Sequence, residues 1–125
     1  MISLKVDEAF AFDYLSILQV KFGLDKNEET KKVKRAIFDA CCKNLEVELG
    51  QELFERIFES KAYAQLYVAN LDTFNLVDKA KTDAVKASEV DKANYKRFLC
   101  KNALQKAFFN SETKELKIGY ENANY

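Results

Sequence analysis

One stretch near the start of the chain, residues 9–22 (AFAFDYLSILQVKF), limits the possible folds more than any other. Ten of its fourteen residues are apolar, and at about 100° per residue they point in nearly every direction around a helix. A helix that is apolar all round is buried, and this one is too short to cross a bilayer, which takes roughly 20 apolar residues. We therefore expect a central helix that other helices enclose on all sides, and no membrane contact.

The rest of the composition also favours helices. The 125 residues include no proline and three glycines, so the turn residues that sheet-rich folds usually need are scarce. Helix formers such as Ala, Leu, Lys and Glu dominate. The length suits one hydrophobic core. We expect a mainly α protein, a single domain spanning residues 1–125, built as a compact bundle of about five helices around the buried first helix.

Capping signals set the expected helix boundaries. Asp25 with Glu28 three residues later predicts a capping box, Ser60 and Ser88 are expected to be N-cap residues, and Gly23 is expected to end the first helix. The expected helices are residues 9–22, 26–49, 51–59, 61–86 and 88–109. In the second of them, the apolar stripe expected to face the core is Val33, Ile37, Ala40, Cys41, Leu45 and Leu49.

Both ends of the sequence show strand periodicity. Ile2, Leu4 and Val6 alternate with polar residues, and Leu116 and Ile118 do so near the other end. A single short strand is not stable alone. We therefore expect these two segments, residues 2–6 and 115–119, to pair as a small two-strand ribbon.

Charge and residue usage exclude several classes of function. The 20 basic and 20 acidic residues cancel, so no basic excess favours nucleic acid or an anionic membrane, and the basic run at residues 31–35 is best explained as a solvated helix face. The absence of histidine removes the usual nucleophile–histidine pairs and histidine metal sites. Three cysteines without a C-x-x-C pair, in a chain without a secretory signal, indicate buried thiols in a reducing cytoplasm. We expect no metal and no cofactor.

An unusual polar strip marks the last helix. Asn94, Arg97, Lys101 and Gln105 lie on one side of it, yet the other directions are so apolar that most of this helix should be covered. Two cations one turn apart in a partly desolvated groove need an acidic partner or an anionic ligand.

Two interpretations of this strip stay open. In the first interpretation, Arg97 and Lys101 pair with Asp13 on the first helix or with Asp78, which lies two turns beyond Asn70 on the fourth helix. These polar side chains then form a structural network. In the other, the set is a groove for an anionic molecule, with one of the two carboxylates as a proton acceptor. The candidate ligand-binding residues are Arg97, Lys101, Asn94, Asn70, Asp78 and Asp13.

The same segments resemble a known family. Residues 13–21 are similar to the D-x-x-T-I-L-E-I-K signature of a bacterial and phage family of small helical proteins known only as a domain of unknown function, with Gln19 in place of its Glu. Residues 66–78 resemble its L-x-x-x-N-x-x-x-W-x-I-x-D motif, with Phe for Trp, and residues 94–105 its N-x-x-R-x-x-x-K-x-x-I-N motif. Residues 115–120 resemble its closing E-x-K-x-Y, with one extra residue before Tyr120. The resemblance implies no known activity, although the position of some members near surface-polysaccharide genes implies a sugar-nucleotide or glycan context.

Two functions fit these observations. The first is a non-enzymatic helical binding or interaction module, either a homodimer or bound to a protein partner, which would explain the excess of apolar faces. The second is a small enzyme or receptor for an anionic small molecule, for example a sugar nucleotide, held by Arg97 and Lys101. The first is the expected function, with no nucleic-acid partner.

Overall fold

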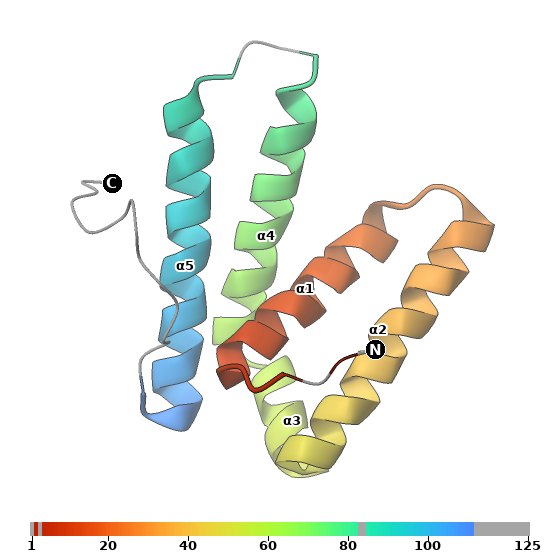
Figure 1. Ribbon diagram of the computed structural model, residues 1–125, viewed down its shortest axis with the longest axis vertical. Helices are drawn as coiled ribbons and strands as arrows, with labels where there is room; N and C mark the ends of the chain where they lie inside the picture. The colour runs from red at the N-terminus through yellow and green to blue at the C-terminus, as the bar shows by residue number, and fades with distance from the viewer. Residues whose placement is uncertain (1, 3, 83–84, 112–125) are drawn as a thin grey trace.

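The computed structural model describes residues 2, 4–82 and 85–111, which form five α-helices (Figure 1). They are α1 (Glu8–Leu24), α2 (Glu28–Leu49), α3 (Gln51–Phe58), α4 (Lys61–Lys79) and α5 (Ala87–Phe109). The described residues contain no strand, so the predicted mainly α bundle of about five helices is confirmed. Of the helices described, none combines the length and the apolar character that crossing a bilayer requires.

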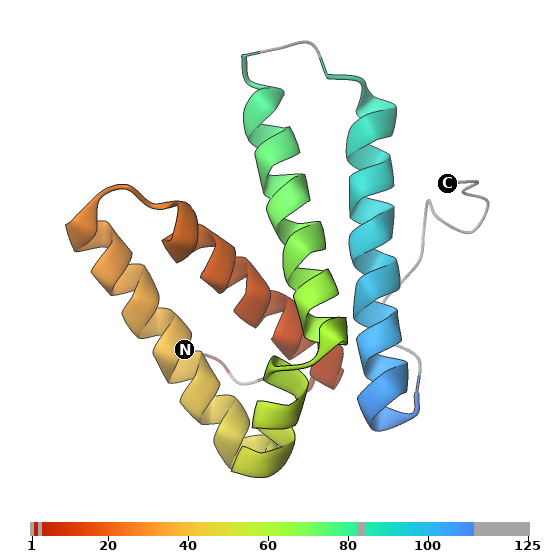
Figure 2. The ribbon, with the colours of Figure 1, turned by 180° about the vertical axis from the view of Figure 1, so that it is seen from behind.

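The helices form two antiparallel pairs that diverge from a common base. α1 and α2 make one pair and α4 and α5 the other, while the short α3 lies at the base and links α2 to α4 (Figures 1 and 2). α1 also packs against α4 and α5, so it is the helix that both pairs share. The apolar stretch at residues 9–22 therefore holds the central position predicted for it.

The core lies where α1 meets the other helices, and aromatic rings dominate it. Its fully buried side chains include Phe12, Leu15, Ile57, Leu66 and Leu104. The ring of Phe58 lies between those of Tyr63, Phe54 and Phe38, at centroid distances of 5.0, 5.6 and 6.2 Å. Buried tyrosines usually keep a hydrogen-bond partner, and the Tyr63 hydroxyl donates to Oε1 of Gln19 at 2.8 Å. Because burial raises the pKa of Tyr63, this hydroxyl stays a donor at neutral pH.

The turn between α1 and α2 differs from the prediction. Gly23 lies inside α1, and the N-cap of α2 is Asn27, whose side chain accepts hydrogen bonds from two backbone N–H groups of the first turn. Asp25, predicted as the cap, instead binds the Nζ of Lys34 at 2.8 Å, the hydroxyl of Thr30 at 2.7 Å and the backbone N–H of Asn27 at 2.9 Å. These donors, with Lys34 the strongest, lower the pKa of Asp25 to about 2.

Of the N-cap residues predicted for the last two helices, one is correct and one is wrong. Ser60 caps α4 as predicted, since its hydroxyl oxygen accepts a hydrogen bond from the backbone N–H of Tyr63 at 3.1 Å. α4 ends at Lys79, earlier than predicted, and residues 80–82 form a turn. The prediction that Ser88 caps α5 is wrong, because the N-cap position is Lys86 and Ser88 is already helical.

Two predicted faces are oriented differently in the structure. α1 is not enclosed on all sides, because Tyr14 is exposed. On α2, the fully packed residue is Phe38, whereas Val33 and Ile37, which were predicted to face the core, are exposed. The predicted stripe drifts around the helix, since its spacing does not match 3.6 residues per turn. Only its second half packs against the core.

The predicted ribbon has no counterpart in the described residues. Residues 4–7 lead into α1 without forming a strand. The predicted partner, residues 115–119, lies outside the described residues, so that half of the prediction has no structural account.

Candidate functional site

The buried carboxylate of Asp13 lies at the centre of a polar cluster between α1, α4 and α5. Its Oδ1 accepts a hydrogen bond from Nδ2 of Asn70 on α4 at 2.8 Å. The same amide nitrogen donates to Oγ of Ser16 at 2.6 Å, and this hydroxyl donates to the backbone carbonyl of Asp13 at 2.8 Å. Asp13 and Ser16 lie three residues apart and so share one face of α1. The cluster therefore fixes α1 against α4.

Two cations from α5 face the other carboxylate oxygen of Asp13. Nη2 of Arg97 lies 3.4 Å and Nζ of Lys101 3.8 Å from Oδ2. Lys101 is buried, and its ammonium group lies 4.1 Å from the centroid of the Phe10 ring, within the range of a cation–π interaction. Both cations of α5 therefore approach the same oxygen of Asp13.

Arg97 is the least satisfied member of the cluster. Its Nη1 donates to Oδ1 of Asn94 at 3.1 Å, and the Asn94 amide donates in turn to the backbone carbonyl of Val90 at 3.2 Å. Its Nε is buried and has no hydrogen-bond partner among the described residues. A guanidinium group carries five donor hydrogens, so Arg97 retains capacity for another acceptor.

Asp78 is the predicted site residue that the structure does not bring into the cluster. Its side chain is 73% exposed and lies 3.8 Å from Nζ of Lys81. It follows Asn70 by two turns of α4, about 12 Å along the axis, where α4 has passed its crossing with α1. The structure brings the other five together: Asp13, Asn70, Asn94, Arg97 and Lys101.

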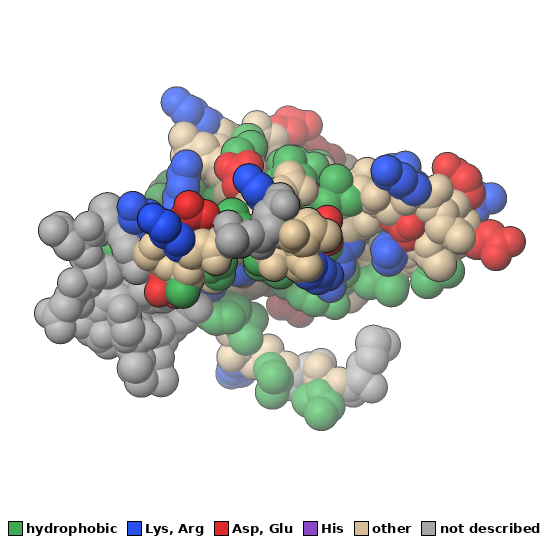
Figure 3. Space-filling model, turned by 90° about the horizontal axis from the view of Figure 1, so that it is seen from above, with side chains coloured by type: hydrophobic (Ala, Val, Ile, Leu, Met, Phe, Trp, Pro, Cys, Tyr) green, Lys and Arg blue, Asp and Glu red, His purple; other side chains and the backbone are tan. Residues whose placement is uncertain are grey.

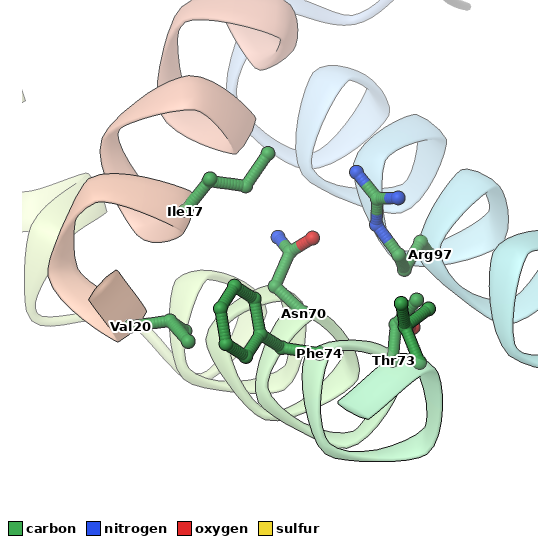
Figure 4. Close-up of a pocket in the computed structure, with 7 residues that line it drawn as sticks. Ile17, Val20, Asn70, Thr73, Phe74 and Arg97 are labelled. Carbon is green, nitrogen blue, oxygen red and sulfur yellow. The ribbon is translucent and has the colours of Figure 1, made fainter. Parts of the chain in front are cut away.

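A small apolar pocket opens beside the cluster. Its volume is about 180 Å³, and its lining residues are Ile17, Val20, Asn70, Thr73, Phe74, Val77 and Arg97. Ile17 and Val20 come from α1 and Phe74 from α4, while Arg97 of α5 lies across the space from them (Figure 4). Asn70 and Arg97 therefore connect the cluster to a pocket whose walls are mostly hydrocarbon.

Sequence reasoning missed the role of Gln105. This residue is 1% exposed, and its Oε1 accepts a hydrogen bond from the backbone N–H of Ala9 at 2.8 Å. Its Nε2 donates to Oε2 of Glu8 at 2.7 Å and to Oγ of Ser111 at 3.1 Å. The first N–H groups of a helix have no acceptor within it, so Gln105 caps α1 from another helix. Its place on the polar strip was a signal, but a backbone target cannot be identified from side-chain patterns.

The three cysteines are free and half-buried. Burial raises the pKa of the Cys41 and Cys100 thiols, and burial, with a smaller effect of Asp39, raises that of Cys42 to about 11. The thiolate is the reactive form. These cysteines are therefore poor nucleophiles at neutral pH, as expected of thiols with a packing role.

The geometry of the cluster favours holding helices together over proton transfer. Asp13 was one of two predicted proton acceptors, and here Oδ1 accepts from Asn70 while Oδ2 faces Arg97 and Lys101. A general base needs an oxygen within reach of a substrate proton. The other predicted acceptor, Asp78, lies on the surface.

No protein-family model, curated protein or solved structure matches this chain. The family resemblance of its motifs therefore stays a prediction.

Proposed function

We propose that this protein is a non-enzymatic helical interaction module that self-associates through the outer face of α2. One observation carries the proposal. On the side of α2 opposite the buried Phe38, the side chains of Val33, Ile37 and Val47 are 61%, 45% and 84% exposed. Seen from above, hydrophobic side chains line the lower edge of the arm that α1 and α2 form, on the right of Figure 3. Exposed apolar side chains that follow one helix face are typical of a protein interface.

The polar cluster supports the same proposal by what it already contacts. Asp13, Asn70 and Lys101 are buried, and each bonds to or pairs with another part of the chain. Buried ion pairs can fix how helices pack. If this cluster has a structural role, the exposed apolar face of α2 is a feature of the described residues that folding alone does not explain.

Measuring the mass in solution tests this proposal. Sedimentation equilibrium should give twice the chain mass of 14.4 kDa for the wild type and one chain mass for Ile37→Lys, because a charge would then be buried at the interface. Val68→Lys on α4 is the matched control, since Val68 is 48% exposed and Ile37 is 45% exposed. It should remain a dimer. A monomeric wild type at about 100 μM would overturn the proposal, because a dimer with a Kd of about 1 μM would be mostly assembled at that concentration.

A cytoplasmic location belongs to the same proposal. The support is the three free thiols, a state that a reducing compartment preserves. Recovery of the protein from cells with its cysteines joined in disulfides would contradict this location.

The pocket beside Arg97 favours a second candidate function, a receptor for a small anion. The buried Nε of Arg97 has no hydrogen-bond partner among the described residues, and Arg97 lines the pocket. A pocket of about 180 Å³ with hydrocarbon walls suits an apolar carboxylate better than a sugar nucleotide. Millimolar benzoate should then raise the melting temperature of the wild type but not of Arg97→Met. No shift with benzoate, inorganic phosphate or a sugar nucleotide would remove this candidate.

A further inference from the structure

We infer that α2 pairs with α2 of a second copy of this chain in parallel and in register, as a short two-stranded coiled coil. The inference rests on the proposed function and adds the partner, the direction and the register. It starts from the spacing of the exposed residues on the outer face of α2, Val33, Ile37, Ala40, Asn44 and Val47, which follow one another at intervals of four, three, four and three.

This alternation of three and four is the seam of a coiled coil. Val33, Ala40 and Val47 take the d positions, and Ile37 and Asn44 take the a positions. All five side chains are exposed in the single chain, whereas the inner side of α2 packs on α1. An asparagine at an a position is a known determinant of register and of strand number. In a parallel pair Asn44 meets its own copy and satisfies its amide there.

The charges beside the seam agree with the parallel direction. Glu29 and Lys43 take g positions, and Lys34 and Glu48 take the e positions five residues after each of them. In a parallel pair g faces the e of the following heptad on the other chain, so Glu29 faces Lys34 and Lys43 faces Glu48. Both contacts are attractive, and symmetry produces each of them twice.

An antiparallel pair fits these residues less well. In an antiparallel pair, each g position faces a g position of the other chain, and each e position faces an e position. Contact of Glu29 with Lys43 would be favourable, and so would contact of Lys34 with Glu48. These two contacts require different registers, so no single antiparallel pair makes both. The register that overlaps the whole seam also places Asn44 opposite Val33, which buries the amide against hydrocarbon. Lys34 already binds Asp25 in its own chain at 2.8 Å. Within the described residues Lys43 and Glu48 take part in no ion pair, so their contact is the informative one.

Cross-linking of Val47→Cys in the full chain tests the direction. Val47 is 84% exposed, so the substitution should not disturb the fold. In the parallel pair the introduced thiol meets its own copy, and mild oxidation should give a covalent dimer. Peptide mass spectrometry should then assign the disulfide to the two introduced thiols. Wild type, which retains the three native cysteines, is the control for background disulfides.

The outcomes separate the direction from self-association itself. A wild type that is dimeric, with no bond in Val47→Cys alone but a bond between the two variants in an equimolar mixture of Val33→Cys and Asn44→Cys, would show an antiparallel pair. That result overturns this inference and leaves the proposed function standing. A monomeric wild type overturns both.

A charge reversal tests the register without cysteine chemistry. Lys43→Glu should raise the dissociation constant of the dimer by roughly tenfold, because both symmetry-related contacts with Glu48 become repulsive. The double variant Lys43→Glu/Glu48→Lys should restore the wild-type value. A single variant that dimerises as the wild type does, or a double variant that gives no rescue, would overturn the assigned register.

Discussion

Replacing Asp13 with asparagine should destabilise the fold strongly, although the change is nearly isosteric. The substitution keeps an acceptor for Asn70 at Oδ1 but removes the negative charge that Arg97 and Lys101 share. Breaking a buried ion pair from one side costs about 3–5 kcal/mol. The Arg97 side chain is 26% exposed, and both cations lie at 3.4 Å or more from Oδ2, so we expect about 2–4 kcal/mol.

Thermal and urea denaturation would measure this cost. At about 4 °C per kcal/mol for a domain of this size, the melting temperature should fall by about 8–16 °C. Asp78→Asn is the matched control, because it removes the same charge from a pair in which both side chains are more than 70% exposed, at 73% and 72%. Its cost should stay below about 0.5 kcal/mol.

A double variant identifies the cause of the loss. If the cost of Asp13→Asn arises from the loss of the charge that faces Arg97, adding Arg97→Met should recover part of the stability, because methionine fills much of the same volume without a charge. A cost of Asp13→Asn below about 1 kcal/mol would refute the argument. So would a double variant less stable than the single one.

Three further measurements test other parts of the structure. Gln105→Met should cost about 1–3 kcal/mol in urea denaturation, because the buried backbone N–H of Ala9 loses its acceptor; a neutral change would contradict the cross-helix cap. The pKa of Asp25 is lowered from 3.8 to about 2 on folding, so its contribution is present above pH 4 and lost as the pH falls toward 2. The melting temperature of wild type should therefore exceed that of Asp25→Asn near pH 6 and approach it near pH 2, and a constant difference would refute this. Leu15→Ala should cost about 2–5 kcal/mol and Ile17→Ala about 1–2 kcal/mol, because Leu15 is fully buried and Ile17 borders the pocket; equal costs would mean that the pocket is filled.

The sequence predicted the helical class and the centre of the fold because both depend on local signals. The apolar stretch at residues 9–22 has too few polar positions to lie on a surface, and capping by Ser60 depends on a neighbour three residues away. The orientation of α2 was not accessible in this way. That helix has two apolar arcs, one around Phe38 and one that includes Val33 and Ile37, and periodicity does not tell which of them meets α1.

The sequence also predicted part of the candidate site but not all of it. Helical spacing alone placed Arg97 and Lys101 on one face of α5, and the need of two cations for an acid singled out Asp13 and Asp78 as candidates. Choosing between the two acids required the crossing of α1 and α4, which places Asn70 beside Asp13 and leaves Asp78 beyond the contact. The position at which two helices cross is set by the packing of whole helices, and the residue spacing within one helix does not reveal it.

The sharing of α1 by both helical pairs has a consequence for synthesis on the ribosome. The hairpin of α1 and α2 is local and can form when the first 49 residues have emerged. The partners of Asp13 come later, from Asn70 of α4 and from Arg97 and Lys101 of α5. Until α5 emerges, the face of α1 that carries Asp13 stays open to water and to other chains, as partly made domains generally do. Most of the chain must therefore be synthesised before its first helix is covered.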